Sequence, residues 1–174
     1  MNTPANPDAL PSAGDPLPAI TTMPGMQLLR NWIVSARLKA MPPPEEQAQI
    51  AEVAKALSAS LTPAKPAEIA KMIEDLAWHY PRQERPDPAR QTVARDWLRD
   101  LGHLPADIID AACTAWRRAP NQFAPTPGHI LALAEPILHT RQFWTRRAAE
   151  LSGRPLPKIV APKAAAPVSR KEQA

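Results

Sequence analysis

Apolar residues recur at spacings of three and four through the central part of this chain, the spacing that gathers them on one face of an α-helix. A first helix is predicted from Gly25 to Ala40. The next helix begins after three consecutive prolines and has the most regular apolar stripe of the chain: Ile50, Val53, Ala54, Leu57 and Leu61. Residues typical of strands are scarce, and no hairpin dipeptide such as Asn-Gly occurs.

Proline marks the starts of the remaining predicted helices. One helix follows Pro66 and is expected to stop at Pro81. The next starts at residues 87–88 with an Asp cap and a proline, and another opens at Pro105. The last helix begins at Pro127, and Pro136 within it is expected to cause a kink or a break. The pattern predicts an all-α fold, a compact bundle of about five to six short helices.

The ends of the chain differ from this central part. The chain holds 23 prolines against 5 glycines, and the prolines crowd both termini. These segments have few large apolar residues, so burial cannot offset the entropy lost on ordering them. The sequence predicts a disordered leader over residues 1–22, a helical domain over 23–152, and a disordered basic tail rich in Pro, Ala and Lys over 153–174.

Positive charge is concentrated in that tail. The chain carries a formal net charge of +4, with −2 in residues 1–20 and +4 in residues 152–174, which leaves +2 for the segment between them. A broad DNA-binding surface is therefore not expected on the folded body. The tail could meet an acidic protein patch or phosphate groups, and composition does not choose between these.

Cysteine use and hydropathy indicate the compartment. The single cysteine, Cys113, excludes an internal disulfide and fits a reducing environment. The N-terminal residues lack the basic and apolar regions of a secretory signal, and no stretch approaches the ~20 apolar residues that span a bilayer. We expect a soluble protein of the bacterial cytoplasm with no membrane partner.

Residues that could carry catalysis or hold a metal are dispersed. None of the 4 histidines is spaced from another His or a Cys as metal ligands are. Cys113 lies on an apolar stripe between Ile109 and Trp116, where core packing is the expected role. The chain has no glycine-rich phosphate loop and no paired carboxylates. We expect neither enzymatic activity, nor a catalytic residue, nor a metal, nor a cofactor.

Tryptophan is frequent, with 5 residues in the chain. Trp32, Trp78, Trp97 and Trp116 lie on or beside apolar stripes and are expected in the core. Trp144 follows Phe143 and is flanked by arginines, the combination that dominates binding hot spots, although a partly buried Trp on a solvated helix fits as well. We expect a C-terminal arm to bind the partner through these side chains: Arg141, Phe143, Trp144, Arg146, Arg147, Arg154, Lys158, Lys163, Arg170 and Lys171.

Residues 66–138 carry a recognisable succession of motifs. An aromatic-proline motif at Trp78-His-Tyr80-Pro81 is followed by a Trp/Leu helix at 95–101 and an apolar helix that begins after Pro105. Phe123-Ala-Pro125-Thr126-Pro127 then opens the last helix. This succession resembles the phage and prophage replicative-helicase loader/inhibitor family, although here Ala124 interrupts the usual Phe-Pro pair and the helices before Pro66 and after Pro136 are additional.

The resemblance implies a non-enzymatic protein of a phage DNA-replication module. Its partner would be a hexameric replicative DNA helicase, which it loads or restrains. An origin-binding initiator protein would be a second partner, and the basic tail could make a weak contact with DNA. The alternative is a small helical DNA-binding protein, a phage regulator or packaging-initiator subunit, that inserts the helix 108–118 or 127–138 into the major groove. The residues in the first turns of those helices are acidic or small, which favours the helicase-binding protein over the DNA-binding one.

Overall fold

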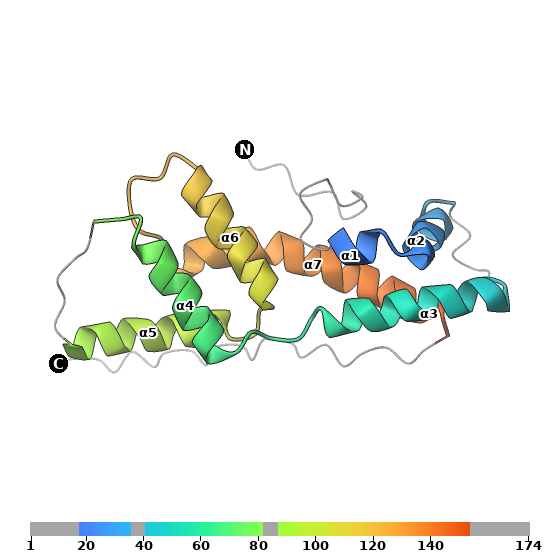
Figure 1. Cartoon of the computed structure of the whole chain (residues 1–174), viewed down its shortest axis with the longest axis horizontal. Coiled ribbons are helices and arrows are strands. Elements are labelled where there is room, and N and C mark those ends of the chain that lie inside the picture. The colour runs from blue at the N-terminus through green and yellow to red at the C-terminus, as the bar shows by residue number, and fades with distance from the viewer. Residues whose placement is uncertain (1–17, 36–40, 82–86, 154–174) are drawn as a thin grey trace, which may run out of the picture.

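The computed structural model describes residues 18–35, 41–81 and 87–153 (Figure 1). Within them the chain forms helices only, as the sequence predicted. They are α1 (Pro18–Thr21), α2 (Pro24–Val34), α3 (Pro44–Ala59), α4 (Pro66–Ala77), α5 (Asp87–Leu101), α6 (Ala106–Arg118) and α7 (Pro127–Leu151). Among these described helices, none combines the length and the apolarity that crossing a lipid bilayer requires.

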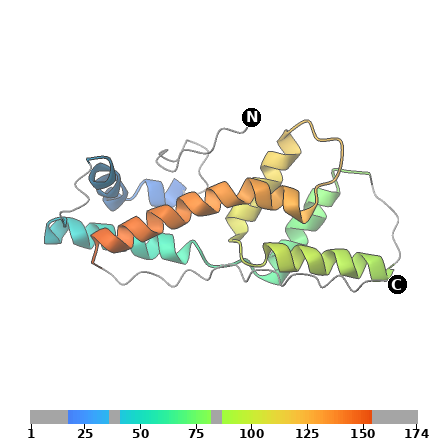
Figure 2. The same cartoon turned by 180° about the vertical axis from the view of Figure 1, so that it is seen from behind.

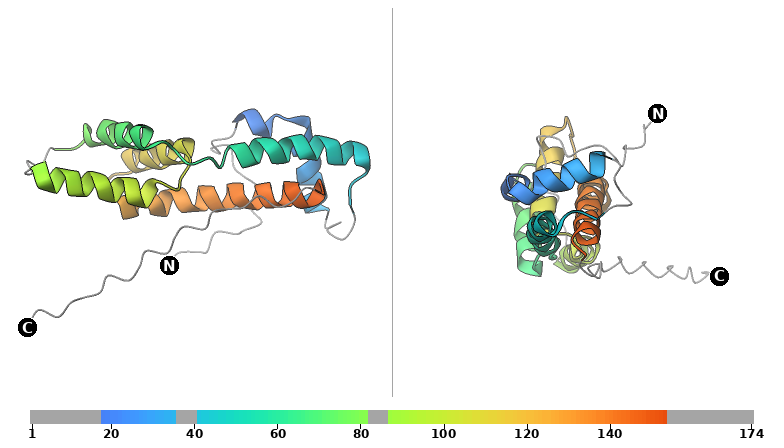
Figure 3. Two further views of the ribbon diagram at one scale, coloured as in Figure 1. Left: turned by 90° about the horizontal axis from the view of Figure 1, so that it is seen from below. Right: turned by 90° about the vertical axis from the view of Figure 1, so that its right-hand side faces the viewer.

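The helices are divided between two cores that lie along α7, which passes through the middle of the molecule, while α5 extends beyond one of its ends and α3 beyond the other (Figures 1 and 2). One core joins α4, α5 and α6 to the first half of α7, around Leu101, Ile109 and Ile130. The other joins α1, α2 and α3 to the second half of α7, around Leu29 and Ile50. The result is an all-α fold, as predicted, whose helices extend along one axis, as the views from below and from the end show (Figure 3). We call these parts the α4–α6 unit and the α1–α3 unit.

Proline starts four of the helices, and for α3, α4 and α7 the sequence predicted this start. Pro24, Pro44, Pro66 and Pro127 each occupy the first position of their helix, where the missing N–H would have no intrahelical acceptor. Side chains then cap two of these starts. The backbone N–H of Lys65 donates to Glu68 at 2.8 Å, and that of Thr126 donates to Nδ1 of His129 at 3.1 Å.

Three predicted boundaries were wrong. The first long helix ends at Val34, and residues 36–40 lie outside the described part of the chain. The third ends at Ala77 rather than at Pro81, and a turn covers the intervening residues. Residues 18–22 do not belong to a disordered leader, because Ile20 in α1 is buried in the second core. A single apolar residue has no period, so the sequence pattern could not indicate this contact. The remaining leader, residues 1–17, and the tail from 154 lie outside the described residues.

Of the kink or break expected at Pro136, the break does not occur, and α7 is continuous from Pro127 to Leu151. Pro136 leaves the carbonyl of Ala132 without its usual N–H donor. Both residues are on the exposed side of α7, so water can satisfy that carbonyl, while the packed side holds the helix together. This continuity is what allows one helix to serve both cores.

Candidate functional site

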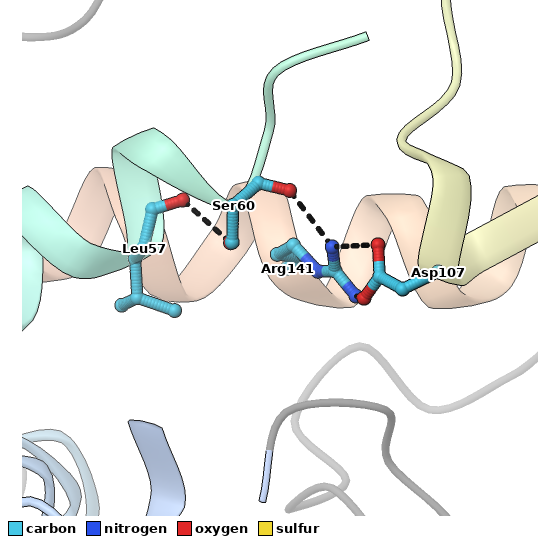
Figure 4. A network of polar contacts seen from close by, with 4 residues as sticks. All are labelled: Leu57, Ser60, Asp107 and Arg141. Carbon is cyan, nitrogen blue, oxygen red and sulfur yellow. Dashed lines mark hydrogen bonds and ion pairs between the residues drawn. The ribbon is translucent and has the colours of Figure 1, made fainter. Parts of the chain in front are cut away.

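Arg141 was expected on the partner-binding arm, and this prediction was wrong. Its side chain is 1% exposed and lies at the middle of α7, between the two cores. The guanidinium donates from Nη1 to Oδ1 of Asp107 at 3.0 Å and from Nη2 to Oδ2 at 2.6 Å, a bidentate pair. Nη1 also donates to the carbonyl oxygen of Ser60 at 2.8 Å (Figure 4). Arg141 therefore makes an internal junction and offers nothing to a partner.

Trp144 was also expected to bind the partner, and it is buried instead, with 4% of its surface exposed. It packs in the second core with Ala148 and Leu151. Phe143 is half-buried against this core, and its ring meets the Trp144 ring edge-on at a centroid distance of 5.7 Å. Trp144 follows Leu138 and Arg141 at the spacing of the buried stripe, so the position of Trp144 along the helix indicated burial. The arginines that flank it suggested a binding surface instead.

The rest of the expected arm divides into two groups. Arg146 is exposed on α7, and Arg147 forms an ion pair with Glu150 at 2.7 Å. The remaining basic residues lie outside the described residues: Arg154, Lys158, Lys163, Arg170 and Lys171. Of the expected arm, the structure thus leaves Arg146 on the surface, and it removes the apolar anchor that the arm was expected to contain.

Two other aromatic side chains are exposed. Trp78, at the C-terminal end of α4, is 63% exposed, and Phe123, in the loop between α6 and α7, is 78% exposed. Trp78 was expected in the core. It lies two positions after the buried Leu76, which places it about 200° around the helix from the buried face at about 100° per residue. The sequence therefore held the signal for Trp78 as well, in the phase of its helix.

The segments that hold these two aromatics lie at the same end of the molecule. The end of α4 and the α6–α7 loop both belong to the end farthest from α2 and α3 in the two opposite views (Figures 1 and 2). Each comes from one of the two aromatic-proline motifs, Trp78-His-Tyr80-Pro81 and Phe123-Ala-Pro125-Thr126-Pro127. We call Trp78 and Phe123 the aromatic end. Large aromatic side chains on an exposed surface are the residue type that anchors protein interfaces.

The α6–α7 loop is held at both sides by defined contacts. His129, in the first turn of α7, stacks on Trp116 of α6 with a centroid distance of 4.6 Å and an interplanar angle of 16°. Asn121 Nδ2 donates to the carbonyl oxygen of Trp116 at 2.9 Å. Because Thr126 also donates its N–H to His129, the loop that carries Phe123 is bounded by fixed points. This limits the entropy lost when a partner binds the loop.

The single cysteine and the clustering of possible metal ligands describe the reactive groups of this part of the chain. Cys113 is buried in the first core, and burial, reinforced by the Asp110 carboxylate, raises the pKa of its thiol to about 11. A thiol in this state is not a nucleophile near neutral pH. Over the described ranges, no three His, Cys, Asp or Glu side chains come together as a metal site would require. A hollow between α4 and α6 is lined by charged and apolar side chains: Glu68, Lys71, Met72, Ala106, Asp107 and Asp110.

Comparisons of the chain with known protein families, with curated proteins and with solved structures give no significant match.

Proposed function

We propose that this protein is a non-enzymatic accessory factor of phage or prophage DNA replication that binds a hexameric replicative helicase and loads or regulates it. The proposal rests on the aromatic end. Two of the motifs that carry the resemblance to helicase loaders contain Trp78 and Phe123, and these side chains have 63% and 78% of their surfaces exposed. An exposed Trp and Phe supply the anchors that a protein partner needs.

The architecture of the α4–α6 unit supports the same proposal. Residues 66–138, over which the resemblance extends, include α4, α5, α6 and the first half of α7, and these share one core. The unit is thus a scaffold with its own apolar interior, and the aromatic end is a feature of its surface. Arg146 and the basic residues after Gly153 contribute charge, which speeds association with an acidic partner more than it adds affinity.

The DNA-binding alternative finds less support in the position of α6. A recognition helix presents its first turns to base edges in the major groove. In α6 Ile108 and Ile109 are 0% exposed, and the residues beside them that do reach the surface, Asp107 and Asp110, are carboxylates that disfavour contact with phosphates. We therefore keep DNA binding as an outcome of the test rather than as a second proposal.

The test measures binding of the purified protein to the hexameric helicase of the bacterial host by isothermal titration calorimetry. Trp78→Ala and Phe123→Ala should each weaken binding by at least ~30-fold, the effect of losing a hot-spot anchor. Val34→Ala is the matched control, because Val34 is 68% exposed but lies on α2, in the other unit. It should bind as the wild type does.

A second arm of the experiment separates helicase binding from DNA binding. The wild type and a variant that lacks residues 154–174 are titrated with duplex DNA at two salt concentrations. Strong, salt-dependent DNA binding without helicase contact would contradict the proposal and favour the DNA-binding class. Helicase binding that is unchanged in both aromatic variants would remove the aromatic end from the interface.

A further inference from the structure

The α4–α6 unit and the α1–α3 unit are joined mainly by α7, which packs in the core of each. The helices α2 and α3 pack on each other and on α7, and none of the extensive helix–helix contacts joins them to α4, α5 or α6. Ile130, Ala134 and Leu138 of α7 belong to the first core, and Trp144 and Ala148 belong to the second. A shared helix fixes the axis along which the units lie, but the angle between them about that axis needs a further contact.

That further contact is made where three segments meet. The α3–α4 link contacts the start of the α6 region through the N–H of Ala64, which donates to the carbonyl oxygen of Leu104 at 2.9 Å. Beside it, Arg141 of α7 donates to Asp107 of α6 and to the carbonyl oxygen of Ser60 at the end of α3 (Figure 4). One side chain thus contacts the last residue before the link and the first turn of a helix in the other unit.

The contacts of Arg141 fix the relative positions of the segments they join more than they stabilise the fold. Arg141 and Thr145 are the buried polar side chains of the described chain, and Arg141 takes a position on α7 where the buried stripe would accept an apolar residue. A buried ion pair gains little over apolar packing, because desolvation offsets most of the attraction, whereas a planar guanidinium fixes the direction of each bond it makes. The carbonyl that accepts from Arg141 belongs to Ser60, the C-cap residue of α3, and carbonyls at the C-terminal end of a helix have no intrahelical donor.

We propose that Arg141 is a coupling residue that sets the orientation of the α1–α3 unit relative to the α4–α6 unit, and that release of its pair with Asp107 lets the two units rotate about α7. The carboxylate of Asp107 is 42% exposed, so it can be hydrated when the pair opens, which makes the opening reversible. The proposal concerns the relative motion of the units and does not depend on which partner the protein binds.

The test measures the distance between the units by pulsed electron spin resonance. Spin labels are attached at Lys55→Cys on α3 and Arg95→Cys on α5, both exposed positions, in a Cys113→Ala background. Arg141→Met should broaden the distance distribution, because the apolar side chain fills the space without directional bonds. Arg147→Met is the control, since Arg147 pairs with Glu150 on the same helix and joins no other unit. It should leave the distribution as narrow as in the labelled parent.

Hydrogen exchange distinguishes coupling from a general loss of stability. In Arg141→Met the amide of Ala64 should exchange at least ~10-fold faster, while amides in the middle of α3 and α5 keep their rates, as expected of a local opening. Asp107→Asn and Arg141→Lys, which each retain part of the contact, provide the same readouts if Arg141→Met does not fold. An unchanged distance distribution, or exchange that rises equally throughout both units, would overturn the proposal.

Discussion

The contact between α2 and α3 depends on the absence of a side chain at Gly25. This residue is buried in the first turn of α2. A Cβ atom built there would overlap the backbone carbonyl oxygen of Gln49 and would lie 2.9 Å from Cγ2 of Val53. A backbone carbonyl inside a helix cannot rotate away, so Gly25→Ala must push α2 off α3.

The size of the effect follows from two opposed terms. Overpacking of this kind costs about 1–3 kcal/mol, whereas Ala in place of Gly favours a helix by up to about 1 kcal/mol. We expect Gly25→Ala to lower the free energy of unfolding by about 1–2 kcal/mol. For a protein of this size, each kcal/mol lost lowers the melting temperature by about 2–4 °C. Urea denaturation followed by circular dichroism measures this directly.

Gly128→Ala provides a matched control. Gly128, like Gly25, is the second residue of its helix and follows a proline. A Cβ atom at Gly128 would meet only Oγ1 of Thr126, at 3.9 Å, an ordinary contact. Gly128→Ala should therefore leave stability unchanged or raise it by up to about 1 kcal/mol. If Gly25→Ala were as stable as Gly128→Ala, the close α2–α3 approach would not exist in solution.

Three further predictions concern buried groups. Trp144→Ala should cost about 3–5 kcal/mol by urea denaturation, whereas Trp78→Ala should cost under about 1 kcal/mol; similar costs would contradict the assignment of Trp144 to the core. Asp107→Ala should lower the free energy of unfolding by about 3 kcal/mol, because it leaves the guanidinium of Arg141, which is 1% exposed, without its carboxylate. Arg141→Met should cost less, because the carboxylate of Asp107 is 42% exposed and can be hydrated. If Arg141→Met cost more than Asp107→Ala in the same assay, this geometry would be contradicted. Cys113 should react with a thiol reagent at pH 8 only when the protein unfolds, and rapid labelling of the native protein would contradict its burial. The free energy of unfolding should fall as the pH rises from 9.0 towards about 11, because the thiol ionises at lower pH in the unfolded chain than in the folded one.

The sequence by itself determined the helical class and several of the helix starts. Helix starts at Pro44, Pro66 and Pro127 were predictable because proline suits the first position of a helix and removes a donor elsewhere. The all-α class followed from the spacing of apolar residues. Helix phase also contained the information that Trp78 lies outside and Trp144 inside, but the predictions placed Trp78 in the core and Trp144 in a binding arm. Both features depend on residues within one or two turns, so they are readable along the chain.

Tertiary structure alone decided how the helices are divided and what Arg141 does. An arginine on an apolar stripe is ambiguous, because its side chain can reach solvent or a buried partner. Here the partners are Asp107, 34 positions away, and the carbonyl of Ser60, 81 positions away. Which residues so far apart come into contact depends on how α3, α6 and α7 pack, and no period in the sequence records that arrangement. The separation into two cores along one helix has the same origin, since each apolar stripe specifies a buried face but not the helix that covers it.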